Sequence, residues 1–219
     1  MNDTNTDAAI EVMEVADSAV KSKRKNRFES AQPVLEKLFE YYPHLFGERF
    51  LPLKLGIFQE LMAAHPEVFK RDALKTALGV HTRSTRYLQS VAAGLKRHDL
   101  EGKPVEDVAP EHVFLSIMEV FQRRQARSKD DLKPKLRAQL VAAYEASGLS
   151  RQDYLSRLPL LDEAIASQLD DAIAEVEQQR ARRAALVMAY ESSGKSVEEF
   201  SASLGMEVAQ VRTALKERR

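Results

Sequence analysis

The chain has 219 residues, enough for one or two ordinary domains, and its 33 Lys and Arg balance its 33 Asp and Glu. It has no cysteine, which excludes a disulfide framework, a thiolate nucleophile and a thiolate metal site and fits a reducing cytoplasm. The acidic start lacks the features of a secretory signal, and no apolar stretch approaches the roughly 18 residues of a membrane span, so we expect a cytoplasmic protein.

The composition of residues 1–31 predicts a disordered N-terminal extension that is acidic at first and then basic. Residues 1–20 are polar and acidic without strong periodicity. The basic run KSKRKNR, Lys21 to Arg27, is interpreted either as a solvated tail or as an arm for nucleic acid.

Residues 32–127 predict a helical domain. Apolar residues recur at three- and four-residue steps from Gln32 to Tyr42, and Pro43 ends that helix. Glu101-Gly102, between short polar and apolar runs, predicts a small β-hairpin. The other predicted helices cover residues 51–66, 70–82, 84–94 and 111–127, and the last has a basic end at Arg123, Arg124 and Arg127.

Residues 128–219 predict a helical module that contains an internal repeat. The stretch LVAAYEASGLSRQDYLSRL begins at Leu140, and the similar stretch LVMAYESSGKSVEEFSASL begins at Leu186. The two stretches align with each other without a gap. Each unit indicates a helix, a Ser-Gly turn and a short helix that begins after a serine cap. The stretch between the units predicts one long helix, so we expect a duplicated all-helical module.

Positive charge gathers in the first domain. Between Lys21 and Arg127 basic residues outnumber acidic ones by about six, with the densest excess from Lys70 to Lys103. Such a patch is typical of nucleic-acid binders, although a solvated surface of mixed charge is the alternative. The stretch HTRSTRYLQSVAAG crowds hydroxyls and arginines into a helix start, where arginines oppose the helix dipole, and this placement suggests that an anion binds there.

Motifs for catalysis are absent from the sequence. We find no Gly-rich phosphate loop, no HExxH and no GxSxG, and the five histidines are scattered rather than spaced as metal ligands. We therefore expect no enzyme, no catalytic residue, no cofactor and no metal site.

The segment PLKLGIFQEL from Pro52, then ALKTAL, and then HTRSTRYLQSVAAG with LKRHDLEGKP closely resemble the ProQ/FinO family of bacterial RNA chaperones. The resemblance covers about residues 32–127 and implies a helical domain with a small hairpin and a basic concave face. It also implies binding of small RNAs and mRNA 3′ ends, at an intrinsic terminator hairpin followed by a uridine tail, and a role in post-transcriptional regulation. The concave-face positions that it implies are Lys54, Arg71, Lys75, Tyr87 and Arg97, with Arg86 beside the tyrosine.

This resemblance gives the unusual helix start a role. Thr82 and Ser84 leave backbone N–H groups for a phosphate, and Arg83 adds charge-assisted hydrogen bonds, as does Arg86. Tyr87 offers a ring or a hydroxyl to an unpaired terminal nucleotide, and a buried core aromatic is the alternative. This sequence departs from the family at Gly79, where a basic residue is common, and at Thr85, where an aromatic residue is usual. We therefore expect affinity to depend more on Arg83 and on the N-terminal arm.

Two other functions compete for the C-terminal region. Ser196 to Arg218, with Gly205 at the turn, has the pattern of a DNA-binding helix-turn-helix. However, Glu207 lies early in the candidate recognition helix, and an acidic group there repels phosphates. We therefore prefer a protein-interaction module with a protein partner.

Overall fold

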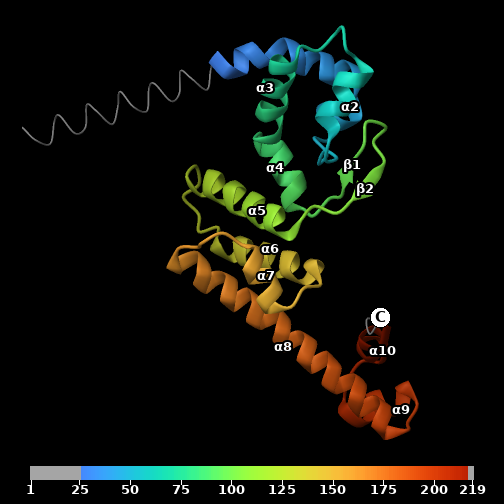
Figure 1. Ribbon diagram of the computed structural model, residues 1–219. Coiled ribbons are helices and arrows are strands. Elements are labelled where there is room, and N and C mark those ends of the chain that lie inside the picture. Colours follow the sequence, from blue (N-terminus) through green and yellow to red (C-terminus); the bar gives the residue numbers. More distant parts are fainter. Residues whose placement is uncertain (1–25, 217–219) are drawn as a thin grey trace, which may run out of the picture. The chain divides into compact units, whose positions relative to one another are not determined.

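The computed structural model describes residues 26–216 and divides the chain into two compact units, one ending at Leu132 and one beginning at Lys133. Helices dominate both units, and the described residues contain one two-stranded antiparallel hairpin (Figure 1). The predicted fold class, mainly helical with a small β-hairpin, is confirmed. Most of the predicted N-terminal extension, including Lys21, lies outside the described residues.

The first described helix covers residues 26–41 and so begins before the predicted boundary at residue 32. Ala31, Leu35 and Leu38 follow one another at helical spacing, and each is at most 6% exposed. The prediction that residues 26–31 are disordered is wrong, because Ala31 extends the apolar stripe by one turn and is buried in the core.

Residues 51–54 are extended and residues 55–56 form a turn, although the sequence predicts a helix there. Leu53 forms a parallel bridge with His98, and the Lys54 amide donates to the His98 carbonyl at 2.9 Å. Helix α2 (Ile57–Ala64) begins only after Gly56. The prediction is wrong because these backbone groups pair with the hairpin instead of with the next turn of a helix.

The remaining elements of the first unit follow the predicted order, with small shifts at their ends. They are helix α3 (Arg71–Thr82), helix α4 (Thr85–Ala92), strand β1 (Arg97–His98), strand β2 (Pro104–Glu106) and helix α5 (Pro110–Gln125). Helix α4 packs extensively against helix α5, and the hairpin connects them (Figure 1).

The turn of the hairpin sits against a short π-helix, η1 (Pro43–Gly47). Gly102 has a φ of 77°, and a Cβ at this position would lie 2.5 Å from Cδ2 of His44. The Nε2 atom of His44 lies 3.2 Å from the carbonyl oxygen of Leu100. A glycine is therefore required at this turn for both its backbone conformation and its close approach to η1.

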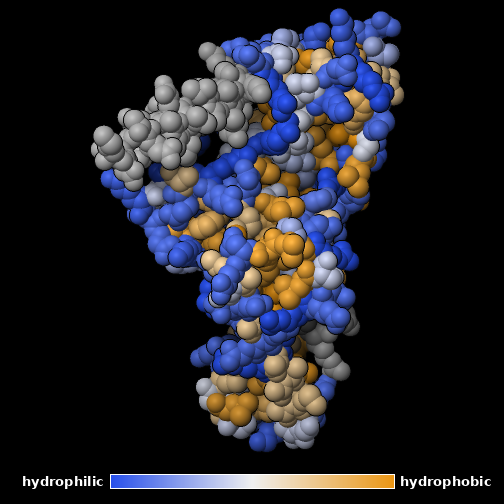
Figure 2. Space-filling model, turned by 60° about the vertical axis from the view of Figure 1, so that its left-hand side comes forward, coloured by the Kyte–Doolittle hydropathy of each residue, from blue (hydrophilic) through white to orange (hydrophobic). Residues whose placement is uncertain are grey.

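The core of the first unit lies among helix 26–41, η1, α2, α3 and α4. Its fully buried side chains include Leu38, Leu45, Phe46, Leu61 and Leu74. Figure 2 shows that hydrophilic residues cover much of one face of the molecule, with apolar residues visible between them.

The second unit is all-helical within the described residues. Its elements are α6 (Lys133–Ser147), α7 (Arg151–Arg157), α8 (Glu163–Ser193), α9 (Val197–Leu204) and α10 (Val208–Lys216). Helix α8 contains the long helix that the sequence predicts between the repeats, and it continues into the second repeat.

The two repeat units have similar local geometry. The rings of Tyr144 and Tyr154 lie 5.2 Å apart at 70°, and those of Tyr190 and Phe200 lie 5.4 Å apart at 72°. Serines at equivalent positions cap α7 and α9. These matches are consistent with a duplication, which stays a prediction from the sequence.

Candidate nucleic-acid interface

Tyr87 and Arg97 hold both backbone groups of Leu53. The Leu53 amide donates to the Tyr87 hydroxyl at 3.1 Å, and Nη1 of Arg97 donates to the Leu53 carbonyl at 2.9 Å. Tyr87 is only 7% exposed, and burial raises the pKa of its hydroxyl. The structure thus places Tyr87 in the core, as the alternative interpretation of this residue expects, and gives Tyr87 and Arg97 a shared role in fixing the extended segment.

The same two side chains line a cavity of about 210 Å³, which we call the Tyr87 cavity. Nη2 of Arg97 lies 3.4 Å from Nδ1 of His112, and its Nε lies 3.9 Å from the carboxylate of Glu106. A guanidinium, an imidazole and a hydroxyl therefore stand beside an apolar wall, a combination that can bind a planar group with polar edges. The lining residues are Tyr87, Val91, Arg97, Val108, His112, Leu115 and Ser116.

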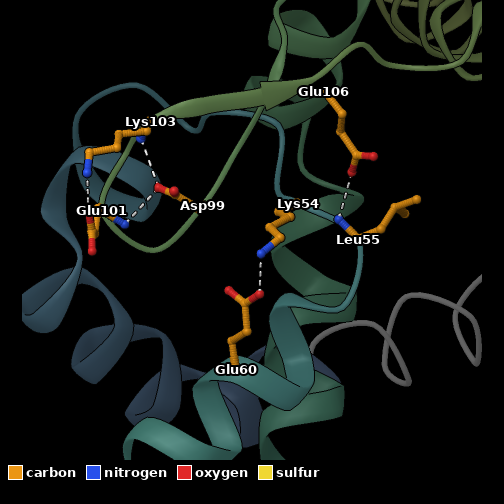
Figure 3. A network of polar contacts seen from close by, with 7 residues as sticks. All are labelled: Lys54, Leu55, Glu60, Asp99, Glu101, Lys103 and Glu106. Carbon is orange, nitrogen blue, oxygen red and sulfur yellow. Dashed lines mark hydrogen bonds and ion pairs between the residues drawn. The ribbon is translucent and has the colours of Figure 1, made fainter.

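Lys54, a predicted contact, is already paired. Its Nζ lies 2.5 Å from Oε1 of Glu60, and this hydrogen bond and charge raise the pKa of the lysine (Figure 3). Next to it, the Leu55 amide donates to the carboxylate of Glu106 at 3.1 Å (Figure 3). Lys54 thus has a defined direction, but a ligand phosphate has to compete with Glu60 for it.

The start of α4 is capped by one of the two predicted hydroxyls. The Tyr87 amide donates to Oγ of Ser84 at 3.2 Å. The hydroxyl of Thr82 instead donates to the Leu78 carbonyl at 2.9 Å, because Thr82 is the last residue of α3 and can reach back one turn. Ser84 is therefore the N-cap of this helix, and Thr82 is bonded within α3.

The basic side chains of α3, of the α3–α4 turn and of the start of α4 are exposed. Arg71 lies over the ring of Phe58 at 5.7 Å, and Arg86 lies over the ring of Phe50 at 5.4 Å. The side chain of Lys75 has no partner among the described residues. These residues keep their positive charge at the surface, where it can attract a polyanion.

Arg83 folds back over Gly79. A Cβ at Gly79 would lie 2.9 Å from Nη2 of Arg83, so the guanidinium occupies the space that a side chain at Gly79 would take. The glycine that replaces a basic residue of the family pattern therefore has a guanidinium above it, supplied by Arg83.

A second cavity, of about 300 Å³, lies where α4 begins and α5 ends; we call it the arginine cavity. Sequence reasoning missed it as a site, although the basic end of the predicted helix 111–127 was its signal. The start of α4 contributes only Thr85 to this cavity, while Tyr87 and Arg97 line the Tyr87 cavity. The other predicted residues of the helix start line neither cavity; they are Thr82, Arg83, Ser84 and Arg86. The lining residues of the arginine cavity are Thr85, Arg123, Arg124, Arg127, Ser128 and Leu132.

Within residues 26–216, no group of three or more His, Asp or Glu side chains is placed to hold a metal ion, and no helix is long and apolar enough to span a membrane.

The first unit coincides with a known family pattern. A family model described as the ProQ/FINO family matches residues 28–133. The RNA chaperone ProQ of Shewanella frigidimarina is 34% identical over 127 residues, which cover 54% of this chain and 62% of that protein. The RNA chaperone ProQ of Shewanella oneidensis is 40% identical over 85 residues, which cover 36% of this chain and 39% of that protein. The chain thus spans less than two thirds of these relatives.

The crystal structure of a FinO-like RNA chaperone from Neisseria meningitidis MC58 is also similar in sequence. It is 33% identical, the similarity covers 40% of this chain and 90% of that one, and the TM-score is 0.37.

Proposed function

Since residues 28–133 of the chain belong to the ProQ/FINO family, we propose that the protein is a cytoplasmic RNA-binding chaperone. The two Shewanella relatives carry the name RNA chaperone, which describes binding and not catalysis. The basic residues exposed on α3 and at the start of α4 support RNA as the ligand, because binding to phosphates depends on such charge.

The preferred ligand in this proposal is the 3′ end of a small RNA or mRNA, at a terminator hairpin with a uridine tail. Side chains cannot reach the base edges in the deep major groove of an A-form RNA duplex, so a protein recognises its phosphates and free ends. The observation that carries the proposal is the Tyr87 cavity within the family domain. It measures about 210 Å³ and brings a guanidinium, an imidazole and a hydroxyl beside an apolar wall, groups that can bind the base edge of a terminal nucleotide.

A change at the RNA end tests this proposal. A hairpin with a short uridine tail and a free 3′ hydroxyl is expected to bind about tenfold or more tightly than the same hairpin with a 3′ phosphate or an unrelated extension, a difference of about 1.4 kcal/mol. Salt and hairpin sequence are held fixed. Equal affinities for the three RNAs would show that the protein holds the duplex and not the end.

The protein side of the site is tested by Arg97→Gln, with Arg49→Gln as the matched control. Both changes remove one positive charge, but Arg49 is exposed and lines neither cavity. We expect only the Arg97 variant to lose the preference for a free 3′ end, and loss of that preference in both would contradict the assignment.

The comparisons do not support the DNA-binding alternative. In the candidate helix-turn-helix, Arg212 of α10 is paired with Glu198 of α9 at 2.6 Å, so a phosphate has to compete with this carboxylate for the arginine. Duplex DNA is expected to compete poorly with terminator RNA. For the second unit we propose that it binds a protein partner, which takes part in the post-transcriptional regulation of the bound RNAs.

A further inference from the structure

We propose that the arginine cavity binds a backbone phosphate of the RNA whose 3′ end occupies the Tyr87 cavity. This inference rests on the proposed function and adds a second contact to it. The cavity brings together one arginine that is held in place and two that have no partner, beside the start of a capped helix.

Arg123 is the fixed member. Its Nη1 donates to the carbonyl of Arg83 at 3.0 Å and to Oγ1 of Thr85 at 3.1 Å. Its Nε donates to Glu119 at 2.8 Å. These contacts neutralise Arg123 and tie the end of α5 to the start of α4, so the wall of the cavity is ordered before any ligand arrives.

Arg124 and Arg127 supply the free positive charge. Both side chains are exposed, and neither has a hydrogen bond or an ion pair with another described residue. The carboxylate of Asp130 lies 3.5 Å from the hydroxyl of Ser128 on the cavity rim, and the Asp130 amide donates to the same hydroxyl at 3.1 Å. The two arginines carry two positive charges against the one negative charge of Asp130, and a forked guanidinium matches the oxygens of a phosphate.

The start of α4 completes the site. Ser84 caps the amide of Tyr87, which leaves the amides of Thr85 and Arg86 without an acceptor among the described residues. An anion near these amides is stabilised by the positive end of the helix dipole. Arginines at the end of α5 also interact favourably with the dipole of that helix. This stabilisation of α5 is the alternative explanation for their position, and it requires no ligand.

The position of the cavity suits one RNA strand. Thr85 lines the arginine cavity and Val91 lines the Tyr87 cavity. Thr85 and Val91 are six positions apart in α4, or about 9 Å along the helix. Neighbouring nucleotides of a single strand can span this distance, so a strand that ends in one cavity can place a phosphate in the other.

The test uses the full chain and a terminator hairpin with a short uridine tail, with the dissociation constant measured over a range of salt concentrations. The variant is Arg124→Gln with Arg127→Gln. The control is Arg49→Gln with Lys129→Gln, which removes the same charge from exposed positions that do not line the cavity. Helix content measured by circular dichroism verifies that both proteins are folded.

We expect the cavity variant to bind about tenfold more weakly and its slope of log affinity against log salt to be shallower by about 1 to 2, while the control loses less than about threefold. Arg124→Lys with Arg127→Lys keeps the charge and loses the fork, so we expect an intermediate loss with little change in slope.

Several outcomes separate this inference from the proposed function. If the unchanged protein does not bind the hairpin, the proposed function fails and this inference fails with it. If the unchanged protein binds and the cavity variant matches the control in affinity and slope, only the phosphate site is refuted. If inorganic phosphate at constant ionic strength weakens RNA binding by the unchanged protein and by the cavity variant to the same extent, phosphate competes at another site and the inference is also refuted.

Discussion

The burial of His81 predicts that the first unit becomes less stable as the pH falls. The imidazole is 2% exposed, and neither ring nitrogen has a hydrogen-bond partner among the described residues. It lies 4.7 Å from the ring of Phe46, 4.7 Å from that of Phe50 and 5.4 Å from that of Tyr87. Burial among these rings lowers the pKa of His81 from 6.5 to about 4, because the charged form loses its hydration.

The sign and size of the effect follow from this pKa. The unfolded chain binds a proton at His81 below pH 6.5, whereas the folded chain binds it only below about pH 4. Stability is therefore unaffected above pH 6.5 and is lost as the pH falls from 6.5 toward 4. The full pKa difference corresponds to a loss of about 3 kcal/mol in the free energy of unfolding, of which about 2 kcal/mol is expected to be lost between about pH 7 and about pH 5.

Urea unfolding of the full chain tests this, with the methyl signals of Leu38 and Leu74 as reporters of the first core. The variant His81→Phe keeps an aromatic ring and removes the ionisable group, so its unfolding free energy is expected to change by about 2 kcal/mol less than that of the unchanged protein over the same pH range. His112→Gln, at an exposed histidine, is the control and is expected to keep the acid sensitivity. Equal pH dependence in the unchanged protein and His81→Phe would refute the reasoning.

Further predictions concern the residues around the site. Tyr87→Phe leaves the Leu53 amide without its acceptor and is expected to lower the unfolding free energy by about 1–3 kcal/mol in urea; no loss would mean that the amide finds another partner. Ser84→Ala removes the cap of α4 and is expected to cost about 1 kcal/mol, measured in the same way, with a neutral result contradicting the cap. Gly79→Ala is expected to stabilise α3 by up to about 1 kcal/mol and to displace the guanidinium of Arg83, so RNA affinity falls while thermal stability rises. Unchanged affinity for RNA would show that Arg83 does not act from its place over Gly79.

Much of the local structure could be predicted because its causes lie within a few residues. The apolar stripes predict the helices, and the serines at positions 84, 150 and 196 are N-caps in the structure. The exception is residue 51 onward, where helical periodicity was misleading. An apolar residue every three or four positions does not distinguish a helix from a short extended segment that is buried by its neighbours.

The candidate site was predictable only in part. The sequence indicated Arg97 and Tyr87 through a family resemblance, and it indicated the helix start through its crowded hydroxyls and arginines. It did not indicate that Tyr87 is buried or that Arg123 reaches the start of α4. Nor could it place Thr85 and Tyr87 in two different cavities, since this depends on how α4 packs against α5.

The sequence by itself determined the helical class, the caps and the excess of positive charge in the first unit, because periodicity, capping and charge act over one or two turns of chain. The tertiary structure decided what those residues do. The contacts of Leu53 with Tyr87 and Arg97 join residues 34 and 44 positions apart, and Arg123 meets Thr85 across 38 positions. Such contacts form only when the core brings distant segments together, and no local pattern in the chain specifies them.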